Sequence, residues 1–514
     1  MDKEILLWGD GNVSSTTSMD LSNNKKELLT GGQGKQPGSQ KNYALPGFIL
    51  AWLVFAAIIT MVPVSEGGLS AEGRAALAVM GWATVIWLTN ALPIGISGLM
   101  IPVLLKLTGA LPKIPMAFAG FTKDVTFLIL GCFILAAVMQ TTGLDRRIAL
   151  GIVSRVKPKV GSVIKGLMAA HLVMAVLVPA TNARGAVFLP IVSGLNNLFG
   201  KTGDGLRARK VLTMVGIGFA SLASGIVLMH SHMSNVIVAQ TINQSVGANT
   251  ITWSKWAWMN WPMLGVLVII YFWCNWILKT KNIEVPGGIE EVKMQKDALG
   301  KMSFTEWVVL VAFSMAILLW ATDEFHKLGS AIVTLGVVML LFIPGLTNLC
   351  WKKVQSNTIW GTWLLLCGSL SLVDAFGSTG VDKWLASHLV GIAPAWGWIG
   401  VTLFVCIVVQ ILRLGIVSNV AAVTLLAPIV AAMAPMLHLN TVAFTMAVLN
   451  VDSFAFVLPI SVTACLIAYG TEEFSFAEFV KVGAPLTLMV ILYTVFIMLP
   501  WYAFTGFPIW VPTN

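Results

Sequence analysis

Charged residues are scarce in this chain of 514 residues. Asp, Glu, Lys and Arg make up 11% of it, whereas a soluble domain carries about a quarter. Hydrophobic residues account for 57%, and the mean hydropathy is +0.84. This composition excludes an ordinary soluble domain and indicates a polytopic membrane protein.

Cysteines and catalytic motifs are also scarce. The six cysteines form no CxxC pair, which argues against a disulfide framework, redox chemistry or a zinc site. The sequence contains no HExxH, Walker A or GxSxG motif, so the rival interpretation as an intramembrane hydrolase has no support. We expect no enzymatic activity, no metal centre and no cofactor, with Na⁺ entering only as a coupling ion.

Long apolar runs are what the sequence has instead. Stretches of about 18–22 residues recur from Pro46 to Trp501, and each is long enough to cross about 30 Å of hydrocarbon. The net charge of +9 comes from basic residues between these runs, which indicates topology signals and no nucleic-acid partner. We predict an all-α polytopic membrane protein with about 11 transmembrane helices and two re-entrant hairpins.

The basic clusters predict the orientation. Residues 1–41 are polar and read as a disordered cytoplasmic tail that ends in lysines before the first span. Four predicted spans, at about 46–64, 75–91, 93–110 and 122–142, then lead to a second basic cluster between Arg146 and Lys159. We therefore expect a multi-pass protein of the plasma membrane with a cytoplasmic N-terminus and, after an odd number of spans, an external C-terminus.

Two similar polar breaks interrupt the apolar runs. The stretch ATNARGAVFLPIV begins at Ala180, and SNVAAVTLLAPIV begins at Ser418, about 238 residues later. Polar backbone at membrane depth must be buried in protein or line a watery cavity. The apolar arms around the first break, Gly166–Pro179 and Gly185–Phe199, are shorter than a comfortable span. Two full antiparallel helices would also return the chain to the same side, but the arm lengths and the uncapped polar tip favour a re-entrant hairpin at each break.

The similarity extends beyond the tips. Residues 127–150 match residues 364–387, including Gly143 with Gly380. An odd number of crossings separates the copies, which predicts an inverted-topology repeat. The predicted parts are a tail (1–41), a first half (42–280), a cytoplasmic linker (281–303) and a second half (304–514).

Each half also contains a second interruption, at 230–235 and at 459–465. A helix split at membrane depth offers carbonyl dipoles to a cation and N–H groups to an anion. Two hairpin tips and two split helices are therefore expected to surround one small charged solute.

At these residues the chain resembles the divalent anion:sodium symporter family of dicarboxylate and citrate carriers. Residues 119–150 and 466–488 carry the likeness, and Ser418-Asn419-Val420 matches two of three positions of the family's Ser-Asn-Thr triplet. The resemblance implies a homodimer in lipid with a scaffold domain and a mobile, elevator-type transport domain. It implies substrates such as succinate, malate, 2-oxoglutarate or citrate, moved by sodium symport or anion exchange. Sulfate or organic sulfonates are the alternative substrates, and an anion channel is the remote alternative.

The chain departs from the family pattern at the first tip. Asn182-Ala183-Arg184 resembles the Thr-Ala-Arg of the family's exchanger branch, and the split helices carry Ser234-Asn235 and Ala464-Cys465 in place of Pro-Asn. Because a fixed guanidinium near the anion can replace a sodium ion as countercharge, Arg184 favours exchange.

The resemblance and the polar breaks together select the site residues. The expected substrate-binding residues are Thr181, Asn182, Arg184, Ser418, Asn419, Val420 and Thr463. The expected cation-binding residues, if sodium is coupled, are Ala180, Thr181, Ser234, Asn235, Ser418, Asn419 and Cys465. For Asp374 and Asp452, structural pairing is favoured over a contribution to a cation route, and for Arg413 either pairing or ligand contact is expected. For His171, His230 and His232, satisfied polar contacts are favoured over a metal site.

Overall fold

The described part of the protein is helical throughout. The computed structural model describes residues 44–65, 68–247, 250–391, 396–416 and 418–510, and within them no β-strand occurs. The predicted N-terminal tail therefore lies outside the described residues. The helices up to the first hairpin are α2 (Ala44–Met61), α3 (Ala71–Thr89), α4 (Ile94–Leu107), α5 (Ile114–Ala117), α6 (Asp124–Thr142), α7 (Leu144–Val153), α8 (Val160–Leu177) and α9 (Thr181–Asn197).

The remaining helices complete the first half and form the second. The first half continues with α10 (Gly203–Thr213), the π-helix η3 (Met214–Phe219), α11 (Ala220–Ser224), α12 (Met233–Val246), α13 (Trp253–Asn260) and α14 (Gly265–Ile277). After α15 (Glu290–Asp297) come α16 (Phe304–Ala321), α18 (Ser330–Leu341), α19 (Trp351–Asn357), α20 (Trp360–Thr379), α21 (Val381–Val390), α22 (Gly397–Arg413), α23 (Asn419–Met436), α24 (Thr441–Ser453), α25 (Thr463–Tyr469), α26 (Phe476–Tyr493), the π-helix η6 (Thr494–Met498) and α27 (Leu499–Phe504).

Eight helical segments of the described chain are long and apolar enough to cross a membrane. They are Ala44–Met61, Asp124–Thr142, Val160–Leu177, Trp253–Ile277, Phe304–Ala321, Trp360–Thr379, Asn419–Met436 and Phe476–Phe504. Two of these segments, at α16 and α26, begin with a capping box. Ser303 with Glu306, and Ser475 with Glu478, satisfy free amides at the start of these helices. The polytopic membrane architecture follows from these apolar segments.

The two hairpins consist of α8 with α9 and of α22 with α23. The predicted arm lengths of the first hairpin were wrong, because α8 has 18 residues and α9 has 17. The helix resumes at Thr181, directly after a short extended segment at 178–180. Polar side chains are tolerated in a first helical turn, so Thr181 and Asn182 start α9 and do not interrupt it.

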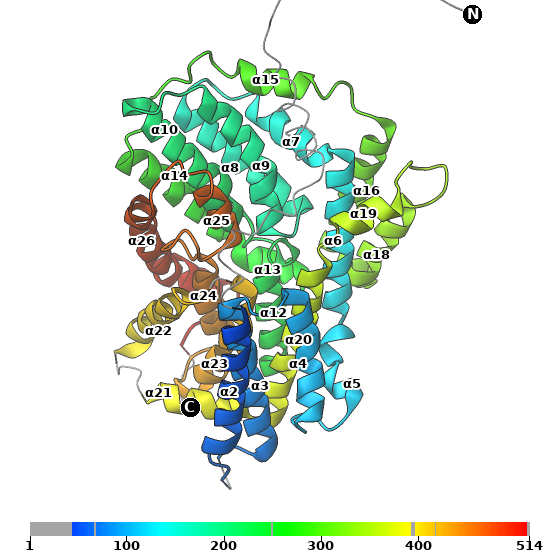
Figure 1. The fold of residues 1–514 in the computed structure, drawn as a ribbon, viewed down its shortest axis with the longest axis vertical. Helices are drawn as coiled ribbons and strands as arrows, with labels where there is room; N and C mark the ends of the chain where they lie inside the picture. The colour runs from blue at the N-terminus through cyan, green and yellow to red at the C-terminus, as the bar shows by residue number, and fades with distance from the viewer. Residues whose placement is uncertain (1–43, 66–67, 248–249, 392–395, 417, 511–514) are drawn as a thin grey trace, which may run out of the picture.

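The order of elements after α6 recurs after α20. Gly143 ends α6 with φ 78° and ψ 10°, and Gly380 ends α20 with φ 72° and ψ 13°. A connector helix of ten residues follows each glycine, and then come a hairpin and an interrupted helix. The connectors α7 and α21 lie toward opposite ends of the molecule (Figure 1).

The two halves pack into each other through these elements. The hairpin arm α9 contacts α25 of the second half, and the hairpin arm α23 contacts α12 of the first half. Each hairpin therefore packs against the split helix of the other half.

Polar links hold the basic end of the molecule, where α7, α10 and α15 lie (Figure 1). Arg147 Nε donates to Glu306 at 2.7 Å, and its other nitrogens donate to the carbonyl oxygens of Leu299 and Gly300. Arg209 binds both carboxylate oxygens of Glu473. These links join the segment before α16 to α7, and α10 to the loop before α26.

The contact between α4 and α20 depends on glycine. A Cβ on Gly368 would lie 2.0 Å from the carbonyl oxygen of Gly98, and one on Gly98 would lie 2.5 Å from the carbonyl oxygen of Leu364. We expect Gly368→Ala to lower the free energy of unfolding by about 1–3 kcal/mol, because the backbones must separate. The thermal midpoint of the purified protein in detergent measures the change.

Gly377→Ala is the matched control in the same helix, since its Cβ meets no described atom within 4 Å. Equal midpoints for the two variants would contradict the close approach of α4 and α20.

Candidate functional site

Both hairpin tips are helix N-termini. Ala180 is extended and precedes α9 without a side-chain cap, whereas Ser418 Oγ accepts from the Ala421 amide at 3.3 Å and caps α23. The first-turn amides of a helix lack intrahelical partners and carry a partial positive charge. Each tip thus presents N–H donors of the kind that bind anions.

Both split helices are broken over a longer stretch than the sequence predicted. The first half-helix ends at Ser224 and the second begins at Met233, while in the other half the chain leaves α24 at Ser453 and re-enters helix at Thr463. Polar and apolar residues alternate irregularly there, so the sequence pattern did not mark the helix ends. Ser234, Asn235 and Cys465 accordingly lie in the first turn of a half-helix.

Asn235 fixes the first break. Its Nδ2 donates to the carbonyl oxygens of Gly225 at 2.9 Å and Leu228 at 3.0 Å. The side chain therefore satisfies unwound backbone inside the protein, and the Leu228 carbonyl also accepts from the Ser231 amide at 3.1 Å.

Arg184 ties the first tip to the first break. Its side chain is fully buried, and Nη1 donates to the carbonyl oxygens of Val178 at 2.6 Å and Ser231 at 2.9 Å. Nη2 donates to the carbonyl oxygen of Ser221 at 2.8 Å. A Cβ on Gly225 would lie 2.5 Å from Nη2, so a glycine there makes room for the guanidinium.

Arg413 makes the equivalent connection in the second half. Nη1 donates to the carbonyl oxygen of Ile416 at 2.5 Å, and Nη2 donates to the carbonyl oxygen of Ser461 at 3.3 Å and to Asn419 Oδ1. Ile416 and Val178 each stand two residues before the residue that caps the second arm. Ser461 and Ser231 each stand directly before the cap of the second half-helix.

Each arginine thus joins the hairpin tip to the break of the split helix in its own half, but the two residues occupy different positions in the repeat. Arg184 lies in the second arm of its hairpin, whereas Arg413 ends the first arm. An alignment of the two tips cannot pair them, which is why the sequence repeat did not identify their equivalence.

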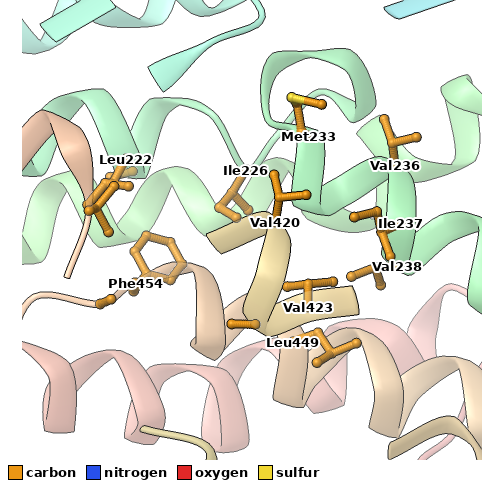
Figure 2. Packing of buried hydrophobic residues seen from close by; sticks show 14 of the residues in the cluster. Leu222, Ile226, Met233, Val236, Ile237, Val238, Val420, Val423, Leu449 and Phe454 are labelled. Carbon is orange, nitrogen blue, oxygen red and sulfur yellow. The ribbon is translucent and has the colours of Figure 1, made fainter. Parts of the chain in front are cut away.

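A hydrogen bond joins the halves between these arginines. Asn419 Nδ2 donates to His232 Nε2 at 3.1 Å, so this ring nitrogen is the acceptor. Because His232 follows Ser231, the contacts run from Arg184 through the first break to Asn419, then to Arg413 and the second break. Next to Asn419 in the chain, Val420 and Val423 of α23 lie among Ile226, Val238 and Leu449 (Figure 2).

Arg413 also pairs with a buried carboxyl group. Its Nε lies 3.5 Å from Asp452 Oδ1, and both side chains are almost fully buried. This confirms the expected structural pairing of Asp452. Asp374 pairs with Lys123 at 2.7 Å and accepts from Gln244.

The structure brings some predicted site residues together. Asn419 and Arg184 belong to the polar chain between the tips, and Thr181, Ser234 and Cys465 are buried nearby on α9, α12 and α25. Ser234 Oγ has no hydrogen-bond partner among the described residues. Asn182 and Thr463 are exposed, and no hydrogen bond within the described chain joins them to the polar chain.

Arg413 and His232 were not among the predicted substrate-binding or cation-binding residues, although the sequence predicted pairing or ligand contact for Arg413 and a polar contact for His232. The signal that could have selected them is intramembrane charge and polarity, since such groups face protein interiors and mark functional pathways. His171 and His230 make satisfied polar contacts, as expected, with the carbonyl oxygens of Gly216 at 2.8 Å and Val176 at 3.0 Å.

A family comparison decides the kind of protein. The protein-family model for the sodium:sulfate symporter transmembrane region matches residues 47–507 of this chain. The chain belongs to this family. A membrane protein of Cupriavidus necator is 30% identical over 470 residues, which cover 86% of this chain and 91% of that protein. The sodium-dependent dicarboxylate transporter SdcS of Staphylococcus saprophyticus is 26% identical over 486 residues, covering 89% and 91%.

Two solved transporter structures share the fold. The MtrF structure of Neisseria gonorrhoeae gives a TM-score of 0.52 at 11% identity and covers 93% of this chain and 97% of that one. The YdaH structure of Alcanivorax borkumensis gives 0.50 at 14% identity and covers 74% and 85%. At these identities the likeness concerns the fold alone.

The pair of Arg413 and Asp452 can be tested by a double-mutant cycle. We expect Arg413→Gln to lower the free energy of unfolding by about 3–5 kcal/mol, because Asp452 is left buried without its countercharge. Adding Asp452→Asn should recover a large part of this loss. Thermal midpoints of the four proteins give the coupling energy.

The pair of Lys123 and Asp374, with each side chain 19% exposed, is the control and should give a smaller coupling. A coupling near zero for Arg413 and Asp452 would show that the ion pair does not stabilise the fold.

Proposed function

We propose that this protein is a secondary active transporter of di- and tricarboxylate anions of the succinate, malate, 2-oxoglutarate and citrate class. The relatives named as sodium-dependent dicarboxylate transporters, which align with 89% of the chain, support this substrate class. The main evidence for the substrate site is that the two helix N-termini at the hairpin tips and two buried guanidinium groups lie where the two halves of the protein meet. Donor groups of this kind suit a dianion.

We place the substrate between the hairpin tips. Thr181, Asn182 and Ser418 would contact carboxylate oxygens with hydroxyl and amide groups, together with first-turn amides of α9 and α23. Such contacts bind an anion selectively and still release it on the other side. In this proposal Arg184 and Arg413 hold the tips in place and add positive potential, while Val420 and Thr463 line the site.

The architecture we propose is an inverted repeat of about 11 spans and two re-entrant hairpins, in a homodimer with an elevator-type transport domain. The recurring order of elements and the opposite positions of α7 and α21 (Figure 1) support the repeat. The basic residues around α7, α10 and α15 support a cytoplasmic N-terminus. The segment 281–303, which contains α15, would be the cytoplasmic linker between the halves.

Sodium symport is the coupling that the relatives' names favour. Ser234 Oγ is buried without a partner, and Ala180, Thr181, Asn235, Ser418, Asn419 and Cys465 lie at the tips and half-helix starts where a cation would bind. Hydroxyl, amide and backbone oxygens are the ligands that a hard cation prefers.

Anion exchange is the second candidate, and a specific observation favours it. The carbonyl oxygens of Val178, Ser231 and Ile416, at the tips and one break, accept hydrogen bonds from guanidinium groups. An oxygen that accepts from a fixed cation is less available to a mobile one.

A counterflow assay in proteoliposomes separates these alternatives. Labelled succinate, malate, 2-oxoglutarate, citrate and sulfate are offered with and without sodium, against internal unlabelled dicarboxylate. Dicarboxylate uptake that requires sodium supports symport, whereas uptake without sodium that requires internal dicarboxylate supports exchange. Uptake of sulfate alone, or single-channel current, would overturn the proposed function.

Asn419→Asp tests the position of the substrate. The new carboxylate would repel a dianion, and it would remove the amide donor to His232, so we expect dicarboxylate uptake to fall at least about tenfold. Initial uptake rates, normalised to the amount of reconstituted protein, measure this loss.

Asn440→Asp is the matched control, because Asn440 caps α24 with Oδ1 and an aspartate caps a helix equally well. Unchanged uptake by Asn419→Asp would place the substrate elsewhere.

A further inference from the structure

A cleft at the basic end of the molecule lies apart from the tips and breaks. It is open to solvent, measures about 600 Å³ and is lined by α7 with Arg155, by the segment from the end of α15 to Met302, and by Leu310 of α16. None of the residues assigned to substrate or cation lines it.

The polar part of the cleft is basic and unpaired. Arg155, Lys296 and Lys301 line it, and their side chains make no hydrogen bond or ion pair within the described chain. Arg147 also lines it but is neutralised by Glu306. Asp297 is the single acidic residue of the lining, so three free cations face one carboxylate.

The other part of the cleft is apolar. Leu144, Ile148 and Ile152 recur at helical spacing on one face of α7, and Leu310 lies on the second turn of α16. The α16 segment is one of the candidate spans. Its Phe304, Trp307 and Val311 are more than half exposed, as expected for a helix face in contact with lipid. Leu310 therefore joins the apolar wall of the cleft to a helix whose exposed face suits contact with lipid.

We propose that this cleft binds an anionic phospholipid of the cytoplasmic leaflet. The phosphate group would lie against Arg155, Lys296 and Lys301, and an acyl chain would follow Ile148, Ile152 and Leu310. A soluble phosphate would use the cations but gain nothing from the apolar wall, whereas a phospholipid matches both parts. Basic side chains near an anionic leaflet attract such lipids, and the bound lipid would join α7 to the start of α16.

Lipid binding by the purified, delipidated protein tests this proposal directly. Phosphatidylglycerol is titrated in an uncharged detergent, bound lipid is counted by native mass spectrometry, and phosphatidylcholine with the same acyl chains is compared. We expect phosphatidylglycerol to bind more tightly, and Arg155→Gln with Lys301→Gln to weaken it by about fivefold for each cation removed. Phosphatidylcholine binding should not change.

The matched control is Lys201→Gln with Lys281→Gln, two exposed lysines that do not line the cleft. A third variant, Leu310→Trp, fills the apolar end while all three cations remain, and it should also weaken phosphatidylglycerol binding. An unchanged melting temperature without lipid verifies that each variant is folded.

Three results would overturn the proposal. They are equal loss of phosphatidylglycerol binding in the cleft and control pairs, equal affinity for the two lipids, and displacement of bound phosphatidylglycerol from the wild-type protein by millimolar inorganic phosphate. Because bound lipid is measured and no transport is required, these results leave the proposed transport function untouched.

Discussion

The structure depends on the satisfaction of unwound backbone inside a membrane protein. Two hairpins and two split helices leave carbonyl groups at membrane depth, where an unpaired polar group costs several kcal/mol. Arg184 and Arg413 donate to these carbonyls, and each joins a hairpin tip to the break of the split helix in its own half. A guanidinium suits this task because it offers five donors in a fixed plane.

These contacts also explain how the two halves act together. Each arginine binds within its half, whereas the hydrogen bond between Asn419 and His232 crosses between halves. The packing of α9 on α25 and of α23 on α12 follows the same crossed arrangement. These contacts connect each tip to the break in its own half and then to the other tip. The two buried guanidinium groups add positive potential at the place where an anion is proposed to bind, with Asp452 balancing one of them.

Much of the fold could be predicted from the sequence because hydropathy alone constrains it. The apolar runs located several candidate spans, including Ala44–Met61 and Asp124–Thr142, but the predicted spans at 75–91 and 93–110 are not among the eight described segments long and apolar enough to cross a membrane. The polar breaks that open at Ala180 and Ser418 located both tips. The connector helices begin after Gly143 and Gly380, as the repeat indicated. The arms of the first hairpin and the limits of both breaks were wrong or imprecise, since an apolar run has the same composition whether it is helical or extended. The family membership followed from motifs spread over most of the chain.

The candidate site was only partly predictable. Polar residues in an apolar run must be buried among partners, so the sequence by itself identified some members of the polar chain, including Arg184 and Asn419, but it also selected Asn182 and Thr463, which are exposed. It did not determine what they bind. Arg413 and Arg184 have no common position in the repeat, and no motif in the sequence singled out Gly225, yet all three shape the connection between tip and break. Only the tertiary structure decided these partners, because a long arginine side chain can reach the equivalent carbonyl group of its half from either arm of the hairpin.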